Sequence, residues 1–272
     1  MLAVKAQDAV IPILGLGTWD VRGKTCSRIV EQALRLGYRH VDTAQAYENE
    51  REVGEGIRAS GLPRENIFVT TKVWWTHLSA GELEHSVAES LVRLRLHHVD
   101  LLLVHWPNSA VPLGETMAAL SKVKREGLTK HIGVSNFTVA LIEEALQVAN
   151  EPIVVNQFEL HPYLDQSKLI DACRRRNMAV MAYSPIARGN IKGDPVLAGI
   201  AVAHGKSPAQ VCLRWLVQQG IVVIPRTSKV ERLTENFEIF DFELAESEMS
   251  AIRVLARPDG RVVDPSWAPA WD

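Results

Sequence analysis

Short apolar runs alternate with longer amphipathic stretches along this chain. The runs are rich in Val, Ile and Leu and do not alternate strictly with polar residues, which is typical of strands covered on both faces of a parallel sheet. The runs predicted as strands are Ile13–Gly17, Tyr38–Asp42, Ile67–Lys72, Val99–His105, His131–Ser135, Ile153–Gln157, Ala179–Tyr183 and Ile221–Ile224.

The stretches between these runs carry apolar residues at helical spacing. In Ala80–Leu96 the acidic residues come early, while Arg93 and Arg95 come late, as the helix dipole favours. The helices predicted in this way are Thr25–Leu36, Ala80–Leu96, Leu141–Ala149 and Lys168–Arg176.

Strands that alternate with helices predict βα units with right-handed crossovers. Eight strands in 272 residues indicate an α/β fold of the (β/α)8 TIM-barrel type, with residues 1–272 as one domain. The competing architecture, an open doubly wound sheet, would carry a glycine-rich turn that opens a helix. Here Gly15-Leu16-Gly17 is not followed by glycine at that spacing, so the barrel is favoured. We expect a short hairpin before Ile13 and an irregular C-terminal tail over Asp264–Asp272.

The balance of charges, the length of the apolar runs and the cysteine pattern limit which partners and which compartment we expect. Lys plus Arg (30) nearly balance Asp plus Glu (32) without a basic block, so we expect no nucleic-acid partner. The longest apolar runs, such as Val99–Val104, are too short to span a bilayer, and the N-terminus shows no export signal. Cys26, Cys173 and Cys212 form no CxxC motif. The scattered cysteines fit a reducing cytoplasm, so we expect a cytoplasmic protein. We also expect a monomer that acts on a small molecule.

Polar and charged residues close most of the predicted strands. Because barrel active sites lie at the C-terminal ends of the strands, these residues are the candidate site. Asp42, Lys72 and His105 end the second, third and fourth strands. The later strands end at or near Ser135, Asn136, Asn156, Gln157, Tyr183, Ser184, Arg226, Thr227 and Ser228.

Three of these candidates, Asp42, Lys72 and His105, together with Tyr47 from the loop after the second strand, suit proton donation to a carbonyl oxygen. A free tyrosine has a pKa of about 10, and an adjacent ammonium such as that of Lys72 lowers the pKa of Tyr47. Asp42 can hold Lys72 in place, and His105 can hydrogen-bond the substrate oxygen. The histidines show no spacing typical of metal ligands. Carbonyl reduction without a metal needs a hydride source, which points to a nicotinamide cofactor.

The ordered motifs resemble the aldo-keto reductase superfamily over nearly the whole chain, and are similar to its bacterial 2,5-diketo-D-gluconate reductase-like branch. The most specific motif runs from Gly37 to Gly54 and contains Val41-Asp42-Thr43-Ala44 and Tyr47-Glu48-Asn49-Glu50. Further motifs are Thr71-Lys72-Val73-Trp74, Leu103-Val104-His105-Trp106-Pro107, Gly133-Val134-Ser135-Asn136-Phe137, Asn156-Gln157, Ala182-Tyr183-Ser184-Pro185 and Ile224-Pro225.

The resemblance implies a role for each of these positions. Tyr47 is the general acid, tuned by Lys72 and Asp42, and His105 orients the substrate carbonyl. Ser135, Asn136 and Gln157 bind the nicotinamide carboxamide, Tyr183 stacks on the nicotinamide ring, and Ser184, Pro185 and Ile186 line the pyrophosphate path.

The adenosine end of the cofactor is expected after the last strand. The family usually reads Ile-Pro-Lys-Ser there, whereas this chain has Ile224-Pro225-Arg226-Thr227-Ser228. Arg226, Lys229 and Arg232 offer a cationic cluster to a 2′-phosphate, so we expect NADPH to be preferred over NADH. The family's Glu-Asn pair, here Glu235 and Asn236, reaches the adenine. The alternative interpretation of the cations is a solvated helix start.

The substrate itself is less defined. Trp19, Trp74 and Trp106 follow predicted strands and are expected to form the substrate-binding mouth together with His105, unless they pack internally. Trp75, Trp267 and Trp271 are further candidates. Such walls suit keto sugars, ketoaldehydes or aromatic aldehydes. Two other functions stay open: a Schiff-base aldolase that uses Lys72, and a non-catalytic regulatory subunit that keeps the cofactor site.

Overall fold

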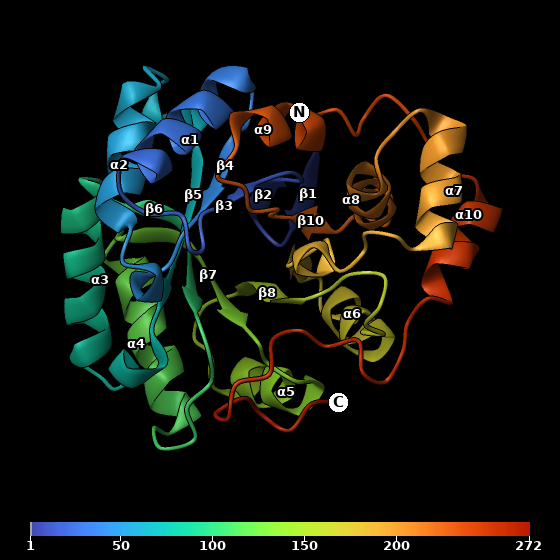
Figure 1. Cartoon of the computed structure of the whole chain (residues 1–272). Coiled ribbons are helices and arrows are strands. Elements are labelled where there is room, and N and C mark those ends of the chain that lie inside the picture. Colours follow the sequence, from blue (N-terminus) through green and yellow to red (C-terminus); the bar gives the residue numbers. More distant parts are fainter. Residues whose placement is uncertain (1) are drawn as a thin grey trace.

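Eight parallel strands form the inner ring of the computed structural model, which describes residues 2–272 (Figure 1). Each strand pairs with the strand that follows it in the chain. They are β3 (Leu16–Gly17), β4 (His40–Asp42), β5 (Phe68–Val73), β6 (Val99–Val104), β7 (Thr129–Ser135), β8 (Ile153–Glu159), β9 (Ala179–Tyr183) and β10 (Val222–Val223). All eight strands coincide with the predicted apolar runs.

The ring closes between its first and last strands. The Gly15 N–H donates to the carbonyl of Val223 at 2.8 Å, and the Val223 N–H donates to the carbonyl of Ile13 at 2.8 Å. A further parallel bridge joins Gly17 to Arg226. The predicted (β/α)8 barrel is therefore confirmed, and the open doubly wound sheet is excluded.

Helices cover the outside of the ring (Figure 1). Because the apolar residues of each helix recur at helical spacing, they form one face that packs on the strands. The four predicted helices are confirmed to within two residues at each end. The helices are α1 (Gly23–Leu36), α2 (Glu50–Ala59), α3 (Glu82–Leu94), α4 (Leu113–Arg125), α5 (Val139–Val148), α6 (Ser167–Arg175), α7 (Pro195–His204), α8 (Pro208–Gln218), α9 (Val230–Phe237) and α10 (Glu246–Arg253).

Two layers of apolar side chains pack against the strands. On β6, Leu102 and Val104 belong to the layer under the helices, whereas Leu101 and Leu103 belong to the cluster inside the ring, as strand alternation requires. The antiparallel hairpin of β1 (Ala3–Ala6) and β2 (Ala9–Pro12) packs Ile11 into that inner cluster. The hairpin predicted before Ile13 is thus confirmed.

The chain after α10 forms a long tail without helix or strand over residues 254–272, as predicted for Asp264–Asp272. Figure 1 shows this red segment running past α6 to α5. The carboxylate of Asp272 accepts a hydrogen bond from the Val139 N–H at 2.9 Å, which fastens the end of the tail to the start of α5.

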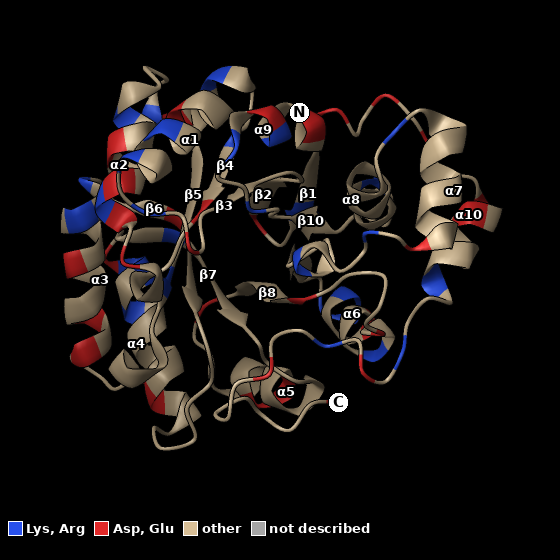
Figure 2. Cartoon of the chain, in the orientation of Figure 1, with Lys and Arg blue, Asp and Glu red and all other residues tan. Residues whose placement is uncertain are grey.

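Charged residues of both signs are scattered over the outer helices (Figure 2). Among residues 2–272 we find no helix that combines the length and the apolar character needed to cross a membrane.

Candidate active site

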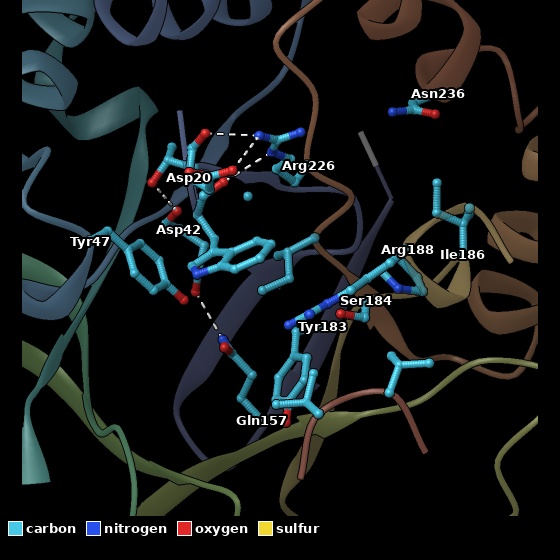
Figure 3. A pocket seen from close by; sticks show the side chains of 18 of the residues that line it. Asp20, Asp42, Tyr47, Gln157, Tyr183, Ser184, Ile186, Arg188, Arg226 and Asn236 are labelled. Atoms are coloured by element: carbon cyan, nitrogen blue, oxygen red, sulfur yellow. Dashed lines mark hydrogen bonds and ion pairs between the residues drawn. The ribbon is translucent and has the colours of Figure 1, made fainter. Parts of the chain in front are cut away.

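The C-terminal ends of the strands open into an elongated cavity of about 920 Å³. That volume lies near the upper end of the ~300–1,000 Å³ range of small-molecule sites. In Figure 3, Tyr47, Gln157 and Tyr183 converge on one end of the cavity, while Asn236 lies at the other. The two ends of the cavity therefore have different surroundings.

Lys72 is the centre of the first end. It lies on β5 and is fully buried, with a relative exposure of 0%. Its ammonium donates to Oδ1 of Asp42 at 2.5 Å, to the carbonyl of Thr43 at 3.0 Å and to the hydroxyl of Tyr47 at 3.2 Å. All three N–H groups are used, so the ammonium is fixed in one orientation.

A short 3₁₀ turn, η1 (Gln45–Tyr47), carries Tyr47 to Lys72. Gln45 supports this turn from behind, because its amide donates to the carbonyl of Ser86 at 3.1 Å and its oxygen accepts from the Trp74 N–H at 2.9 Å. Gln45 thereby ties the turn that holds Tyr47 to the segment that follows β5. Sequence reasoning did not assign a role to Gln45, although it lies two residues before Tyr47 in the most specific motif.

Burial and charge act against each other on this pair. Burial raises the pKa of Tyr47, and the neighbouring Lys72 lowers it only in part, so that this pKa lies above its ordinary value. The sequence predicted a lowered pKa for Tyr47. The Lys72 charge does lower this pKa, as expected, but the net shift is upward, because the prediction left out desolvation. For Lys72, burial lowers the pKa, but the contacts with Asp42 and Tyr47 outweigh burial and raise it. Both groups keep their protons at neutral pH.

His105 follows β6 and is buried next to the tyrosine. Its ring centroid lies 5.5 Å from that of Tyr47 and 5.2 Å from that of Trp74, both edge-on. Burial, and then the charge of Lys72, hold the pKa of His105 well below its ordinary value. The imidazole is therefore neutral at neutral pH and can hydrogen-bond a substrate oxygen without carrying a charge.

Three polar side chains link the strands next to this centre. The Gln157 amide donates to Oδ2 of Asp42 at 2.8 Å, and the Tyr183 hydroxyl donates to Oδ1 of Asn136 at 2.8 Å. Asn136 in turn donates to the carbonyl of His105 at 3.0 Å. Gln157, Asn136 and Tyr183 line the cavity. Ser135 is fully buried behind Asn136 and does not line it.

The segment after β9 lines the middle of the cavity with Ser184, Pro185 and Ile186. Ser184 and Arg188 have positive φ values of 49° and 53°, a conformation that costs energy for residues other than glycine. The Arg188 guanidinium lies 4.5 Å from the ring centroid of Trp19, across the cavity mouth. Arg188 was not predicted as a site residue, because no local pattern in the sequence marks a residue that reaches another loop.

Cations and polar groups surround the far end of the cavity. Arg226 lines it and donates to the carbonyl of Trp19 at 3.0 Å and to that of Asp20 at 2.8 Å (Figure 3). Arg232, Glu235 and Asn236 of α9 also line it. Thr227 and Ser228 do not; the Thr227 hydroxyl instead accepts from the N–H of Lys229 at 3.0 Å.

Tryptophans form the wall near Tyr47. Trp19, Trp74 and Trp106 line the cavity, and the tail adds Trp267, which stacks on Trp75 with the rings 3° from parallel. The other tail residues in this wall are Val262, Val263, Asp264 and Pro265.

The two ends of the cavity suit a phosphorylated dinucleotide. Amide groups of Asn136 and Gln157 and the ring of Tyr183 surround one end, where a carboxamide-bearing ring would fit. Arg226, which is paired with the Asp20 carboxylate at 3.2 Å, and Arg232 place guanidinium groups at the other end, where a phosphate would fit. Within residues 2–272, no cluster of three or more His, Cys, Asp or Glu side chains could hold a metal ion.

Comparison with known proteins agrees with this geometry. The sequence model of the Aldo/keto reductase family matches residues 13–257. The chain is 42% identical to methylglyoxal reductase DkgB of Salmonella typhi over 96% of this chain and 99% of the relative. It is 41% identical to glyoxal reductase of Bacillus subtilis (strain 168), over 94% of this chain and 93% of the relative.

Solved structures show the same fold. The crystal structure of a protein assigned as a 2,5-diketo-D-gluconic acid reductase B superposes with a TM-score of 0.98 at 51% identity, over 99% of this chain and 97% of that chain. An aldo-keto reductase of Bombyx mori in complex with NADP gives a TM-score of 0.90 at 33% identity, over 97% and 95% of the two chains. The chain therefore belongs to the aldo/keto reductase family and is an oxidoreductase that acts on carbonyl groups.

Proposed function

We propose that this chain reduces small aldehydes and ketones to alcohols with NADPH, and that Tyr47 is the general acid. The contact of the Tyr47 hydroxyl with the Lys72 ammonium at 3.2 Å carries the proposal. Tyr47 faces the cavity and keeps its proton at neutral pH, since burial raises its pKa. A carbonyl oxygen held between Tyr47 and His105 would therefore meet a neutral acid and a neutral hydrogen-bonding ring.

The nicotinamide supplies the hydride when it is bound. The Tyr47 proton would move to the substrate oxygen as negative charge develops there, and the phenolate that remains would be stabilised by the Lys72 ammonium. Asp42 keeps the Lys72 ammonium charged throughout, because its Oδ1 lies 2.5 Å from Nζ. Solvent later returns a proton to Tyr47, which is accessible from the cavity.

The environment of Lys72 disfavours the Schiff-base aldolase. Attack on a carbonyl needs an uncharged amine, but three acceptors hold this ammonium and its pKa is raised. The observed contacts of Lys72 suit electrostatic support of Tyr47. The non-catalytic regulatory subunit predicts no turnover, so an activity assay separates it from a reductase.

The names of two relatives point to ketoaldehydes and small dialdehydes, whereas the structure that is 51% identical is named for a keto-sugar acid. Two of the relatives are named methylglyoxal reductase and glyoxal reductase, and both are similar to this chain over almost its full length. Trp19, Trp74 and Trp106 line the cavity together with Tyr47 and His105, so the reacting end has a largely aromatic wall. We infer that methylglyoxal-like ketoaldehydes are the preferred substrates.

The test is NADPH oxidation with a panel of ketoaldehydes, keto sugars and aromatic aldehydes by the wild type and by Tyr47→Phe. We expect Tyr47→Phe to lower kcat about 10²- to 10⁴-fold, the range for loss of a general acid. The matched control is Tyr163→Phe, because this buried tyrosine donates to Asp194 at 3.0 Å and does not line the cavity. Comparable turnover by wild type and Tyr47→Phe would contradict the role of Tyr47.

A further inference from the structure

A second buried carboxylate lies near the cavity, outside the proton-donating centre. Glu159 ends β8, two residues after Gln157, and has a relative exposure of 0%. Its partner in the strand register is Tyr183 of β9. Burial of an ionised carboxylate is costly unless donors surround it, so the partners of Glu159 indicate what it holds in place.

Two of those partners belong to the C-terminal tail. Oε1 of Glu159 accepts from the backbone N–H of Val262 at 2.7 Å, and Oε2 accepts from that of Val263 at 2.8 Å. The third partner is His161, whose Nε2 donates to Oε1 at 2.8 Å. Hydrogen bonds to an ionised acceptor are about twice as strong as neutral ones, and a carboxylate aimed at consecutive amides fixes the direction of the chain.

The anchored segment is the part of the tail that faces the substrate side. Val262 and Val263 line the cavity, and so does Trp267, which comes shortly after them in the chain. Trp267 stacks on Trp75 with centroids 6.0 Å apart and meets Trp74 edge-on at 6.3 Å. Because the tail over residues 254–272 has no helix or strand of its own, its position at the cavity depends on side-chain anchors such as Glu159.

We propose that Glu159 is a positioning residue that holds the tail as the outer wall of the substrate site and so sets the selectivity for bulky over small carbonyl compounds. The selectivity part of this proposal rests on the proposed function, since it requires that the cavity binds a carbonyl substrate. A small ketoaldehyde held by Tyr47 and His105 would not extend to the tail residues, whereas a larger aromatic aldehyde would contact them and depend on them for affinity.

The first test compares methylglyoxal with 4-nitrobenzaldehyde in Glu159→Gln. The substitution keeps the shape but turns one acceptor into an NH₂ group that faces a backbone N–H. We expect KM for 4-nitrobenzaldehyde to rise about tenfold, the size of one lost charged hydrogen bond. The KM for methylglyoxal, kcat for both substrates and the dissociation constant of NADPH are expected to stay within about twofold.

Asp100→Asn is the matched control. Asp100 is a buried carboxylate near the start of β6, at the opposite end of the barrel, and accepts from Arg64 at 2.6 Å, from Lys130 at 2.7 Å and from the Val69 N–H at 2.9 Å. It tests the effect of neutralising a buried carboxylate far from the tail. The proposal is overturned if Asp100→Asn raises KM for 4-nitrobenzaldehyde equally, or if Glu159→Gln raises KM for both substrates alike.

A second test asks whether Glu159 acts through the tail. In a Trp267→Ala background, Glu159→Gln is expected to add less than twofold to KM for 4-nitrobenzaldehyde, because contacts of one unit are not additive. Independent tenfold effects would contradict the coupling. If Glu159→Gln does not fold, Glu159→Asp keeps the charge but shortens the side chain, and the same KM difference is expected from it.

Hydrogen exchange separates this proposal from the proposed function. In cofactor-free protein, the amides of residues 261–264, 266 and 267 are expected to exchange at least tenfold faster in Glu159→Gln than in wild type, with exchange in the barrel strands unchanged. Unchanged exchange in the tail would overturn the anchoring role. If the wild type reduces no carbonyl compound, the proposed function fails, while the exchange result still decides whether Glu159 anchors the tail.

Discussion

Gln157 and Asp42 are 115 residues apart in the chain, yet the Gln157 amide donates to Oδ2 of Asp42 at 2.8 Å. The other oxygen of Asp42 accepts from Lys72. One carboxylate thus joins the side chain expected to bind the carboxamide to the ammonium that supports Tyr47. Each oxygen has a defined partner, so loss of either partner affects both halves of the site.

Replacement of Gln157 by Met tests this connection. The variant leaves one buried oxygen of Asp42 without a donor, which costs about 1–3 kcal/mol of unfolding free energy. We also expect weaker NADPH binding, because the amide is lost from the cavity. Urea unfolding and a fluorescence titration with NADPH measure the two effects. Wild-type stability together with wild-type affinity would show that the hydrogen bond is dispensable.

Replacement of Lys72 by Met separates stability from catalysis. It leaves the buried Asp42 charge without a cation, which costs about 3–5 kcal/mol. The Tyr47 pKa rises further, because the one contribution that lowers it through charge is removed, and reduction slows.

The double variant Lys72→Met with Asp42→Asn completes that test. It removes the unpaired charge, so we expect most of the stability to return while reduction stays slow. Thermal unfolding and NADPH oxidation are measured side by side. Recovery of reduction in the double variant would contradict the role of the ammonium in proton donation.

Replacement of Arg226 by Gly tests cofactor choice. We expect the dissociation constant of NADPH to rise about tenfold or more, the size of a hydrogen bond to a charged group, and that of NADH to change little. Tryptophan fluorescence quenching gives both constants. The contribution of Arg226 should shrink at high salt, since the residue is partly exposed. Equal weakening of both cofactors would mean that Arg226 does not recognise the 2′-phosphate.

The buried His40 predicts a loss of stability in acid. Burial lowers its pKa to about 4, while the unfolded chain has the ordinary value of about 6.5. Between these values the unfolded chain takes up a proton that the folded chain does not. The stability is therefore present above about pH 6.5 and falls by about 3 kcal/mol as the pH drops through about 4.

Two measurements check this prediction. In NMR, the ring signals of His40 should stay constant from pH 7 to 5. Urea unfolding of His40→Asn should depend less on pH over the same range than unfolding of the wild type. A ring that titrates near pH 6.5 in the folded protein would contradict the burial effect.

The sequence predicted most of the site because of how a barrel is built. Parallel strands bring their C-terminal ends to one rim, so Asp42, Lys72 and His105 were expected together even though they are distant in the chain. Tyr47 was expected from the motif that runs from Gly37 to Gly54 and also contains Asp42. Ser135, Thr227 and Ser228 were also expected in the site, but they lie behind or beside the cavity wall. A strand position indicates which rim a residue reaches and leaves the direction of its side chain undetermined.

The sequence by itself determined the strands, the covering helices and the rim that holds the reactive groups, because periodic apolar patterns and strand ends are local features. Only the tertiary structure decided the net pKa direction of Tyr47 and the attachment of the tail to Glu159. The first is a balance between desolvation and charge, and the second joins residues more than 100 positions apart. Both depend on what surrounds a group in space, which no local pattern records.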